Sequence, residues 1–260
     1  MISSRDVVRR AVSSNRLGAY LLSERRRAAR VRRMQVYLEN GFILLERAEG
    51  ILADFREVCL HTLLTPAGIA NLEFVIDSVN TRAVPGAFVE CGTWRGGAVG
   101  YFVRANRRHA SGIDRHAWAF DSFEGFPELS VKDEGERSQA LLGETQWGVP
   151  ESDCREIILS SGISPERAHV IKGWFSDTLP SRVKEIGPIA ILRLDGDLYE
   201  STKTCLDELF DSVVPGGAVI IDDYGVYPGA KRAWDEFNEA RGLGIVLSYG
   251  DCGVRYFFKR

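Results

Sequence analysis

The sequence lacks any apolar run that could cross a membrane, because nothing in its 260 residues approaches the ~18 consecutive apolar residues of a membrane helix. It also lacks internal repeats and low-complexity tracts. The composition is 45% hydrophobic and 27% charged, which is typical of one α/β domain with an appended segment. A membrane protein and a repeat protein are therefore not expected.

Cysteine and histidine are few, and neither shows metal-binding spacing. The cysteines are odd in number and scattered, so they favour reduced thiols in a cytoplasmic protein over a disulfide framework. The four histidines form no ligand motif, and each is interpreted as a structural or surface residue. The residues concerned are Cys59, Cys91, Cys154, Cys205, Cys252, His61, His109, His116 and His169.

Acidic residues are scarce at the start of the chain, where residues 1–33 hold ten arginines against Asp6 and Glu24. The local charge is +8 and the total is −3, so residues 34–260 carry −11. Such an arm can bind nucleic acid or an anionic membrane, or act as a transit peptide. We favour an amphipathic helical lead-in, and the acidic remainder argues against a nucleic-acid enzyme. The apolar stripe of this helix would be Leu21, Leu22, Ala28, Ala29, Val31 and Met34.

The pattern of apolar residues divides the chain near residue 80. Residues 1–80 are predicted to form a helical N-terminal extension or lid, with breaks near 40–41 and 65–68. Residues 81–260 alternate strands and helices, which is typical of an α/β, doubly wound, mostly parallel sheet. Strands are predicted at 87–91, 117–121, 169–172, 189–195 and 218–222, the last after a tight turn at 215–217. Helices are predicted at 95–108, 200–212 and 230–241, and a closing antiparallel hairpin at 245–249 and 254–259.

Residues 122–150 show no clear periodicity and are rich in Gly, Glu and Ser. An irregular segment of this length inside a compact domain is usually a functional loop.

Two of the predicted strands end in carboxylates. Asp195 and Asp197 follow one apolar run, and Asp222 and Asp223 follow the next. Because neighbouring parallel strands finish at the same edge of a sheet, these side chains are expected to crowd one crevice. Clustered carboxylates need a cation, and oxygen ligands favour Mg²⁺, with Ca²⁺ or Mn²⁺ as alternatives. A solvated turn at 222–223 is the competing interpretation.

A glycine turn follows the first predicted strand, within FVECGTWRGG at residues 88–97. The spacing of Gly92, Gly96 and Gly97 does not match the dinucleotide fingerprint, and Glu90 would repel a pyrophosphate. A carboxylate beside such a turn suits S-adenosylmethionine (SAM), whose ammonium would pair with Glu90 and whose carboxylate would meet backbone N–H groups at 92–97. Asp121 ends the second strand, where it is expected to accept hydrogen bonds from ribose hydroxyls.

Five motifs in order resemble the macrocin O-methyltransferase (TylF-type) family: residues 88–97, DSFEGFP at 121–127, KGWFSDTLP at 172–180, LRLDGDLYEST at 192–202 and IDDY at 221–224. The resemblance covers about residues 68–258. It implies a class I SAM-methyltransferase with Rossmann-like strand order 3-2-1-4-5-7-6, a helical lid, and methylation of sugar hydroxyls on antibiotics and related glycosides.

By this resemblance, the metal site falls on Asp195, Asp222 and Asp223, and the general base falls on Asp197. The implied partners are SAM, Mg²⁺ or another divalent cation, and a small-molecule or glycoside substrate. If the enzyme forms a homo-oligomer, the N-terminal helices are the expected interface. The SAM-binding positions are Glu90, Gly92, Trp94, Arg95, Gly96, Asp121, Ser122, Phe123, Gly173, Trp174 and Phe175.

The chemistry is consistent with these positions. A bound metal lowers the pKa of a hydroxyl, a carboxylate at Asp197 can take its proton, and the methyl group then passes in line to oxygen. Helix capping, or pairing with Arg193, is the competing interpretation of Asp197. The competing functions are methylation of a catechol or phenol, a nucleotide-cofactor oxidoreductase, and a non-catalytic SAM-binding protein.

Overall fold

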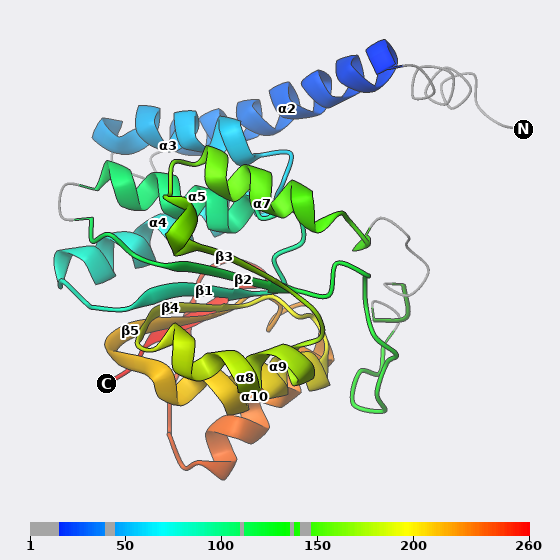
Figure 1. The fold of residues 1–260 in the computed structure, drawn as a ribbon, viewed down its shortest axis with the longest axis vertical. Helices are drawn as coiled ribbons and strands as arrows, with labels where there is room; N and C mark the ends of the chain where they lie inside the picture. The colour runs from blue at the N-terminus through cyan, green and yellow to red at the C-terminus, as the bar shows by residue number, and fades with distance from the viewer. Residues whose placement is uncertain (1–15, 40–44, 110–111, 136–137, 141–146) are drawn as a thin grey trace, which may run out of the picture.

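The structure is a computed structural model, and it describes residues 16–39, 45–109, 112–135, 138–140 and 147–260. The predicted break near residues 40–41, the first half of the basic arm and part of the 122–150 segment lie outside the described residues. A seven-stranded sheet forms the middle layer, and helices cover both of its faces (Figure 1). None of the described helices combines the length and apolar character that a membrane crossing requires.

The strand order is β3-β2-β1-β4-β5-β7-β6, as the family resemblance implies. The first five strands pair in parallel, and β7 and β6 are antiparallel. The strands are β1 (Ala87–Cys91), β2 (Ala117–Asp121), β3 (Ala168–Lys172), β4 (Ile189–Leu194), β5 (Val213–Ile221), β6 (Ser248–Tyr249) and β7 (Arg255–Phe258).

The helices form two layers. On one face lie α2 (Arg16–Glu39), α3 (Leu45–Val58), α4 (Pro66–Thr81), α5 (Gly97–Arg108) and α7 (Glu151–Ser160) (Figure 1). On the other face lie α8 (Phe175–Ile186), α9 (Tyr199–Leu209) and α10 (Pro228–Ala240). Two short 3₁₀ turns, η2 (Pro165–Arg167) and η3 (Phe210–Ser212), precede β3 and β5.

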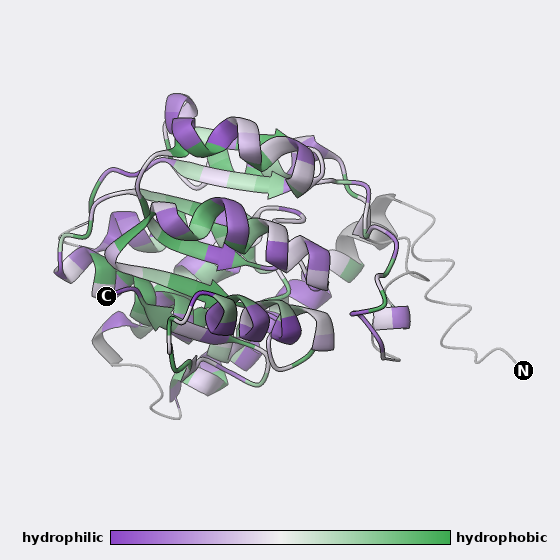
Figure 2. Cartoon of the chain, turned by 90° about the horizontal axis from the view of Figure 1, so that it is seen from below, coloured by the Kyte–Doolittle hydropathy of each residue, from purple (hydrophilic) through white to green (hydrophobic). Residues whose placement is uncertain are grey.

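Each helical layer buries its own hydrophobic cluster against the sheet. Figure 2 shows apolar strands enclosed between helices whose outer faces are hydrophilic. Every residue of β1 and β4 is buried, as expected for parallel strands covered on both sides. Met34 in α2, Phe55 in α3 and Val75 in α4 belong to the same cluster as Phe88 in β1. The N-terminal helices therefore share a core with the sheet.

Three local predictions need correction. Residues 215–217 are part of β5, where a bulge places Val213 opposite Ile189 and Ala218 opposite Ile191. Residues 245–247 are not a strand, because the Asn238 side chain bonds the backbone N–H and C=O of Ile245 in place of a sheet partner. Helices α7 and α8 were not predicted; α8 has a proline, Pro180, inside it.

Candidate active site

The carboxyl ends of β1, β2, β4 and β5 open into one cavity of about 590 Å³. Two further segments contribute to its wall, residues 61–65 before α4 and residues 251–254 before β7. Among the predicted site residues, Arg95, Gly96 and Phe123 do not line this cavity. Those that do are Glu90, Gly92, Trp94, Asp121, Ser122, Gly173, Trp174, Phe175, Asp195, Asp197, Asp222 and Asp223.

The sheet ladder itself brings the acidic strand ends together. The Asp195 N–H donates to the Cys91 carbonyl at 2.8 Å, and the Asp222 N–H donates to the Leu194 carbonyl at 2.9 Å. Gly92 permits this approach, because a Cβ there would lie 1.8 Å from the Asp195 carbonyl oxygen and its φ is +91°. The expected crowding of the two carboxylate pairs is therefore confirmed.

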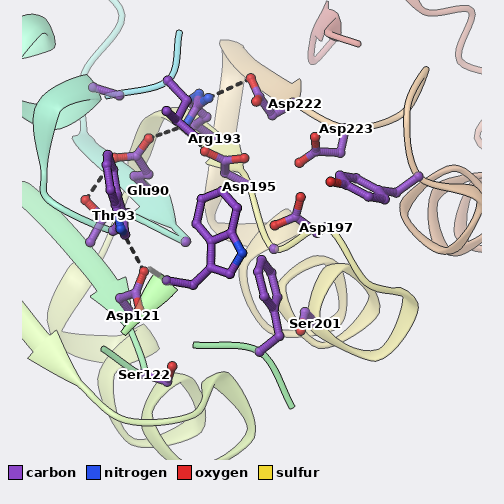
Figure 3. A pocket seen from close by; sticks show the side chains of 18 of the residues that line it. Glu90, Thr93, Asp121, Ser122, Arg193, Asp195, Asp197, Ser201, Asp222 and Asp223 are labelled. Atoms are coloured by element: carbon purple, nitrogen blue, oxygen red, sulfur yellow. Dashed lines mark hydrogen bonds and ion pairs between the residues drawn. The ribbon is translucent and has the colours of Figure 1, made fainter. Parts of the chain in front are cut away.

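Arg193 lies at the centre of this cluster and is 3% exposed. Its guanidinium pairs with Glu90, with Asp195 at 2.6 Å and with Asp222 at 2.6 Å (Figure 3). Burial disfavours its charge, but the three carboxylates outweigh burial and raise the pKa of Arg193 well above its ordinary value. The sequence feature that could have predicted this central position is a charged residue inside the apolar run of β4.

Three carboxylates face one another beyond Arg193. One oxygen from each of Asp195, Asp197 and Asp223 lies within 4.8 Å of the others, and Figure 3 shows Asp197 and Asp223 turned toward each other. Burial, followed by the charge of neighbouring carboxylates, raises the pKa of Asp197 and of Asp223 well above the ordinary value. Burial raises the pKa of Asp222 to about 7, against the opposing effect of Arg193.

This arrangement fits a hard divalent cation. The Oδ2 atom of Asp223 is buried and has no hydrogen-bond partner among the described residues. A buried carboxylate oxygen without a donor is costly unless a cation meets it. The ligand set is oxygen-only, which suits Mg²⁺, Mn²⁺ or Ca²⁺.

Glu90 closes the other side of the Arg193 cluster. It is fully buried, and its second oxygen accepts the Thr93 hydroxyl at 3.0 Å. Burial raises the pKa of Glu90, while Arg193 and Thr93 act in the opposite direction. Glu90 is thus held rigidly at the end of β1, where it forms part of the cavity wall.

Asp121 organises the loops that follow β1 and β2. One of its oxygens accepts the Trp94 N–H at 2.7 Å, and the other accepts the Phe123 N–H at 2.7 Å. Trp94 and Phe123 both have left-handed backbones, with φ of +48° and +57°. Burial raises the pKa of Asp121 despite these bonds. The carboxylate therefore holds two strained turns beside the cavity.

The glycine turn differs from the expectation in one respect. The N–H groups of Gly92, Gly96 and Gly97 donate to the carbonyls of Phe120, Thr93 and His61. These groups are not available to the carboxylate of a ligand in this conformation. The carbonyl of His61 comes from the segment before α4, which crosses directly over the start of α5.

Residues 61–65 are a part of the wall that the sequence did not reveal. Arg30 in α2 donates to the Leu64 carbonyl at 2.9 Å. The Thr65 hydroxyl donates to Asp251 at 2.7 Å and accepts the Gly68 N–H that begins α4. The segment is thus attached to α2 on one side and to the turn before β7 on the other.

Aromatic side chains from the 122–150 segment also line the cavity. The centroid of the Trp147 ring lies 6.3 Å from that of Trp94 and 5.8 Å from that of Phe126, and both contacts are edge-on. Trp174, after β3, is 37% exposed at the wall, and Phe175 begins α8 beside it. The interpretation of residues 122–150 as a functional loop predicts such a contribution, but not which residues make it.

Comparison with known proteins decides the family. A model of the macrocin O-methyltransferase (TylF) family matches residues 25–259. The chain belongs to this family. Among TylF relatives, it is 36% identical over 206 residues to 8-demethyl-8-(2,3-dimethoxy-alpha-L-rhamnosyl)-tetracenomycin-C 4'-O-methyltransferase of Streptomyces olivaceus, covering 75% of this chain and 78% of that one. It is 31% identical over 209 residues to mycinamicin III 3''-O-methyltransferase of Micromonospora griseorubida, covering 79% and 80%.

Solved structures agree with this membership. The O-methyltransferase NovP superposes with a TM-score of 0.69 at 33% identity, covering 76% of this chain and 82% of NovP. A calicheamicin methyltransferase shares the fold at a TM-score of 0.65 and 21% identity, covering 89% and 91%. As a TylF-family member, the protein is a SAM-dependent O-methyltransferase with the Rossmann-like methyltransferase fold.

Proposed function

We propose that the enzyme transfers the methyl group of SAM to a sugar hydroxyl on a glycosylated small molecule. The observation that carries the proposal is the group of three carboxylates within 4.8 Å, placed in the same cavity as the glycine turn and Asp121. The names of the relatives support the acceptor class, since one is a methyltransferase of a rhamnosyl tetracenomycin and another acts on mycinamicin III.

SAM would lie along the ends of β1, β2 and β3. The Glu90 side of the cavity suits the ammonium, because a buried carboxylate stands there. The Asp121 carboxylate already accepts the Trp94 and Phe123 N–H groups, and it has about four lone-pair sites, so it could also accept a ribose hydroxyl. Trp174 and Phe175 would flank the adenine. The remaining predicted contacts, Gly92, Trp94, Arg95, Gly96, Ser122, Phe123 and Gly173, belong to the loops that shape this wall.

Asp195, Asp222 and Asp223 would hold the divalent cation, as the family resemblance implies. The three carboxylates that lie within 4.8 Å of one another are instead Asp195, Asp197 and Asp223, because Asp222 is turned toward Arg193. Asp222 would use the oxygen that Arg193 does not hold, while its Oδ1 stays 2.6 Å from Nη2 of that arginine. A bound divalent cation lowers the pKa of a hydroxyl that coordinates to it. Arg193 keeps Asp195 and Asp222 oriented and offsets part of their charge.

Asp197 would act as the general base. It stands beside the ligands, and its carboxylate faces Asp223 across the cavity. SAM would supply the methyl group, whose bond to sulfur would break as the acceptor oxygen attacks the methyl carbon, and the hydroxyl proton would pass to an oxygen of Asp197. The residues of the cavity wall would hold the reacting atoms in line.

The two parts of the chain would have different roles. Residues 81–260 would form the catalytic domain, and residues 1–80 would form an extension whose 61–65 segment is the lid over SAM. The N-terminal helices are the surface we expect to mediate any homo-oligomer. A cytoplasmic location fits the five free cysteines, four of which are buried.

An acceptor panel tests the proposal. The enzyme would be incubated with SAM and Mg²⁺ together with a rhamnosyl glycoside, its aglycone, or a catechol, and the products analysed by mass spectrometry. We expect one methyl group on the sugar of the glycoside. Methylation of the catechol or the aglycone in place of the sugar would overturn the acceptor assignment and would favour a phenol-type enzyme.

A further inference from the structure

The turn that carries Asp197 has an unusual backbone. Asp197 has a left-handed φ of +58°, and the Leu198 N–H reaches back to the Gly196 carbonyl at 2.5 Å. Helix α9 begins at Tyr199, and the preceding Leu198 offers no side chain that could cap it. Aspartate adopts this conformation more readily than most non-glycine residues, but it is still less favourable than the right-handed region. Contacts from outside the turn would therefore stabilise its far end.

Asp133 supplies that support from a distant part of the chain. Its Oδ1 accepts the Tyr199 N–H at 2.6 Å, across 66 positions of sequence, and the residue is 2% exposed. Its Oδ2 accepts the N–H and the hydroxyl of Ser130 at 3.0 and 2.6 Å. Both oxygens of this buried carboxylate are thus satisfied, as a structural charge requires.

The packing around Asp133 leaves room for the carboxylate and little else. A Cβ at Gly229, in the first turn of α10, would lie 1.9 Å from the Asp133 Oδ1. The carboxylate therefore sits where the first turns of α9 and α10 meet, and the exposed N–H groups of a helix start favour a negative charge there. Lys132 adds a contact to the same helices, through the Tyr199 hydroxyl at 2.6 Å and Glu236 at 3.0 Å.

Residues 130–133, which we term the clasp, belong to the same irregular segment as part of the cavity wall. Phe126 and Trp147 flank the clasp in sequence and line the cavity. The clasp consequently joins that wall to the turn bearing Asp197. We propose that Asp133 is a positioning residue for methyl transfer, which holds the Asp195–Tyr199 turn so that Asp197 points at the acceptor hydroxyl.

The proposal rests on the proposed role of Asp197 as base, and a double-mutant cycle tests both. A misplacement of ~1 Å can cost on the order of 10²-fold in rate, so we expect a kcat loss of that order for Asp133→Ala. The affinity for S-adenosylhomocysteine, measured by calorimetry, should remain close to that of the wild type. Adding Asp133→Ala to Asp197→Asn should cause little further loss, because the first change acts through the second residue.

Two results would overturn the inference in distinguishable ways. Suppose that Asp197→Asn is slow, and that adding Asp133→Ala lowers its kcat by the same factor as in the wild type. Asp133 then has no positioning role, while the role of Asp197 as base stands. An Asp197→Asn enzyme with normal turnover would remove the base role, and the positioning role with it. If the alanine variant does not fold, the same double-mutant cycle is measured with Asp133→Asn in its place.

Hydrogen exchange gives a direct readout of the contact. The Tyr199 amide should exchange faster in Asp133→Ala, which removes the acceptor of its N–H, while amides of the β4 strand keep their protection. Asp207→Ala is the matched control, because Asp207 lies exposed on the same helix and pairs with Lys203. We expect that control to leave kcat and the exchange of Tyr199 unchanged. Unchanged exchange of Tyr199 in Asp133→Ala would contradict the proposal.

Discussion

Arg193 and Asp222 form an ion pair across β4 and β5, with Nη2 of the arginine 2.6 Å from Oδ1 of the aspartate. The same guanidinium also holds Glu90 at the end of β1 and Asp195 at the end of β4. One buried cation thus links three strands at the point where the cavity opens. It supports carboxylates that would otherwise repel one another without a metal.

Removing this cation should destabilise the protein strongly. Arg193→Met leaves three carboxylates without their partner, and breaking a buried ion pair from one side typically costs about 3–5 kcal/mol. The free energy of unfolding, measured with urea in the presence of EDTA, should fall by that order. Arg193→Lys should retain part of the stability that Arg193 contributes, because the charge remains while the forked geometry of the guanidinium is lost.

A surface arginine provides the control for that measurement. Arg182 pairs with Glu185 on α8 with both side chains largely exposed, so Arg182→Met should change stability by less than about 0.5 kcal/mol. If Arg193→Met were as stable as the Arg182 variant, the central role of Arg193 would be wrong.

Metal removal should stop methyl transfer. We expect excess EDTA to abolish activity and Mg²⁺ to restore it, because the acceptor hydroxyl needs a cation to become nucleophilic. Asp223→Asn should require much more Mg²⁺ for the same rate, whereas Asp211→Asn, an exposed change in η3, should not. Undiminished activity in EDTA would leave the carboxylate group without a catalytic function.

Asp121 should matter for the cofactor more than for the metal. Its two oxygens hold the Trp94 and Phe123 N–H groups, which shape the side of the cavity where we propose that SAM binds. Asp121→Ala should weaken S-adenosylhomocysteine binding by roughly 1.5–3 kcal/mol, the usual worth of hydrogen bonds to a charged group. Calorimetry measures this directly, and NAD should not bind either protein. An unchanged affinity would exclude Asp121 from the cofactor site.

The attachment of the 61–65 segment should depend on pH through Asp251. Burial raises the pKa of Asp251, but hydrogen bonds from the Thr65 hydroxyl and two backbone N–H groups together outweigh burial, so the pKa lies below its ordinary value. A lowered carboxyl pKa adds stability above the unfolded value of about 4, and this stability is lost as the pH falls through the folded value. The stability difference between the wild type and Asp251→Asn should therefore be greatest near neutral pH and shrink below about pH 4. A difference that grows on acidification would contradict this assignment.

Much of the fold could be predicted from the sequence because the strands are buried on both faces. An apolar run such as residues 87–91 allows few alternatives, and the parallel order then places Asp195 and Asp222 at one edge. Residues 215–217 were harder to place, because Pro-Gly-Gly is as typical of a turn as of the bulge that it forms in β5. Pro180 likewise obscured helix α8.

The parts of the site that the sequence did not reveal depend on contacts between distant segments. Nothing near His61 indicates that its carbonyl covers the start of α5, and nothing near Asp133 indicates that it caps α9. The orientation of Asp222 toward Arg193 is also a property of the packed sheet, since Arg193 lies in β4 and Asp222 directly follows the neighbouring β5. Such pairings follow from tertiary structure, which local patterns do not encode.

The most direct test of the account is the pH–rate profile of Asp197→Asn at saturating SAM and Mg²⁺. If Asp197 is the base, the variant should bind S-adenosylhomocysteine and metal normally while kcat falls by roughly 10²–10⁴, the typical worth of a positioned general base. The deficit should not respond to added Mg²⁺, and it should shrink as the pH rises and the acceptor hydroxyl ionises unaided. Near-normal turnover of Asp197→Asn at neutral pH would contradict the account and leave Asp197 as a structural residue of the turn before α9.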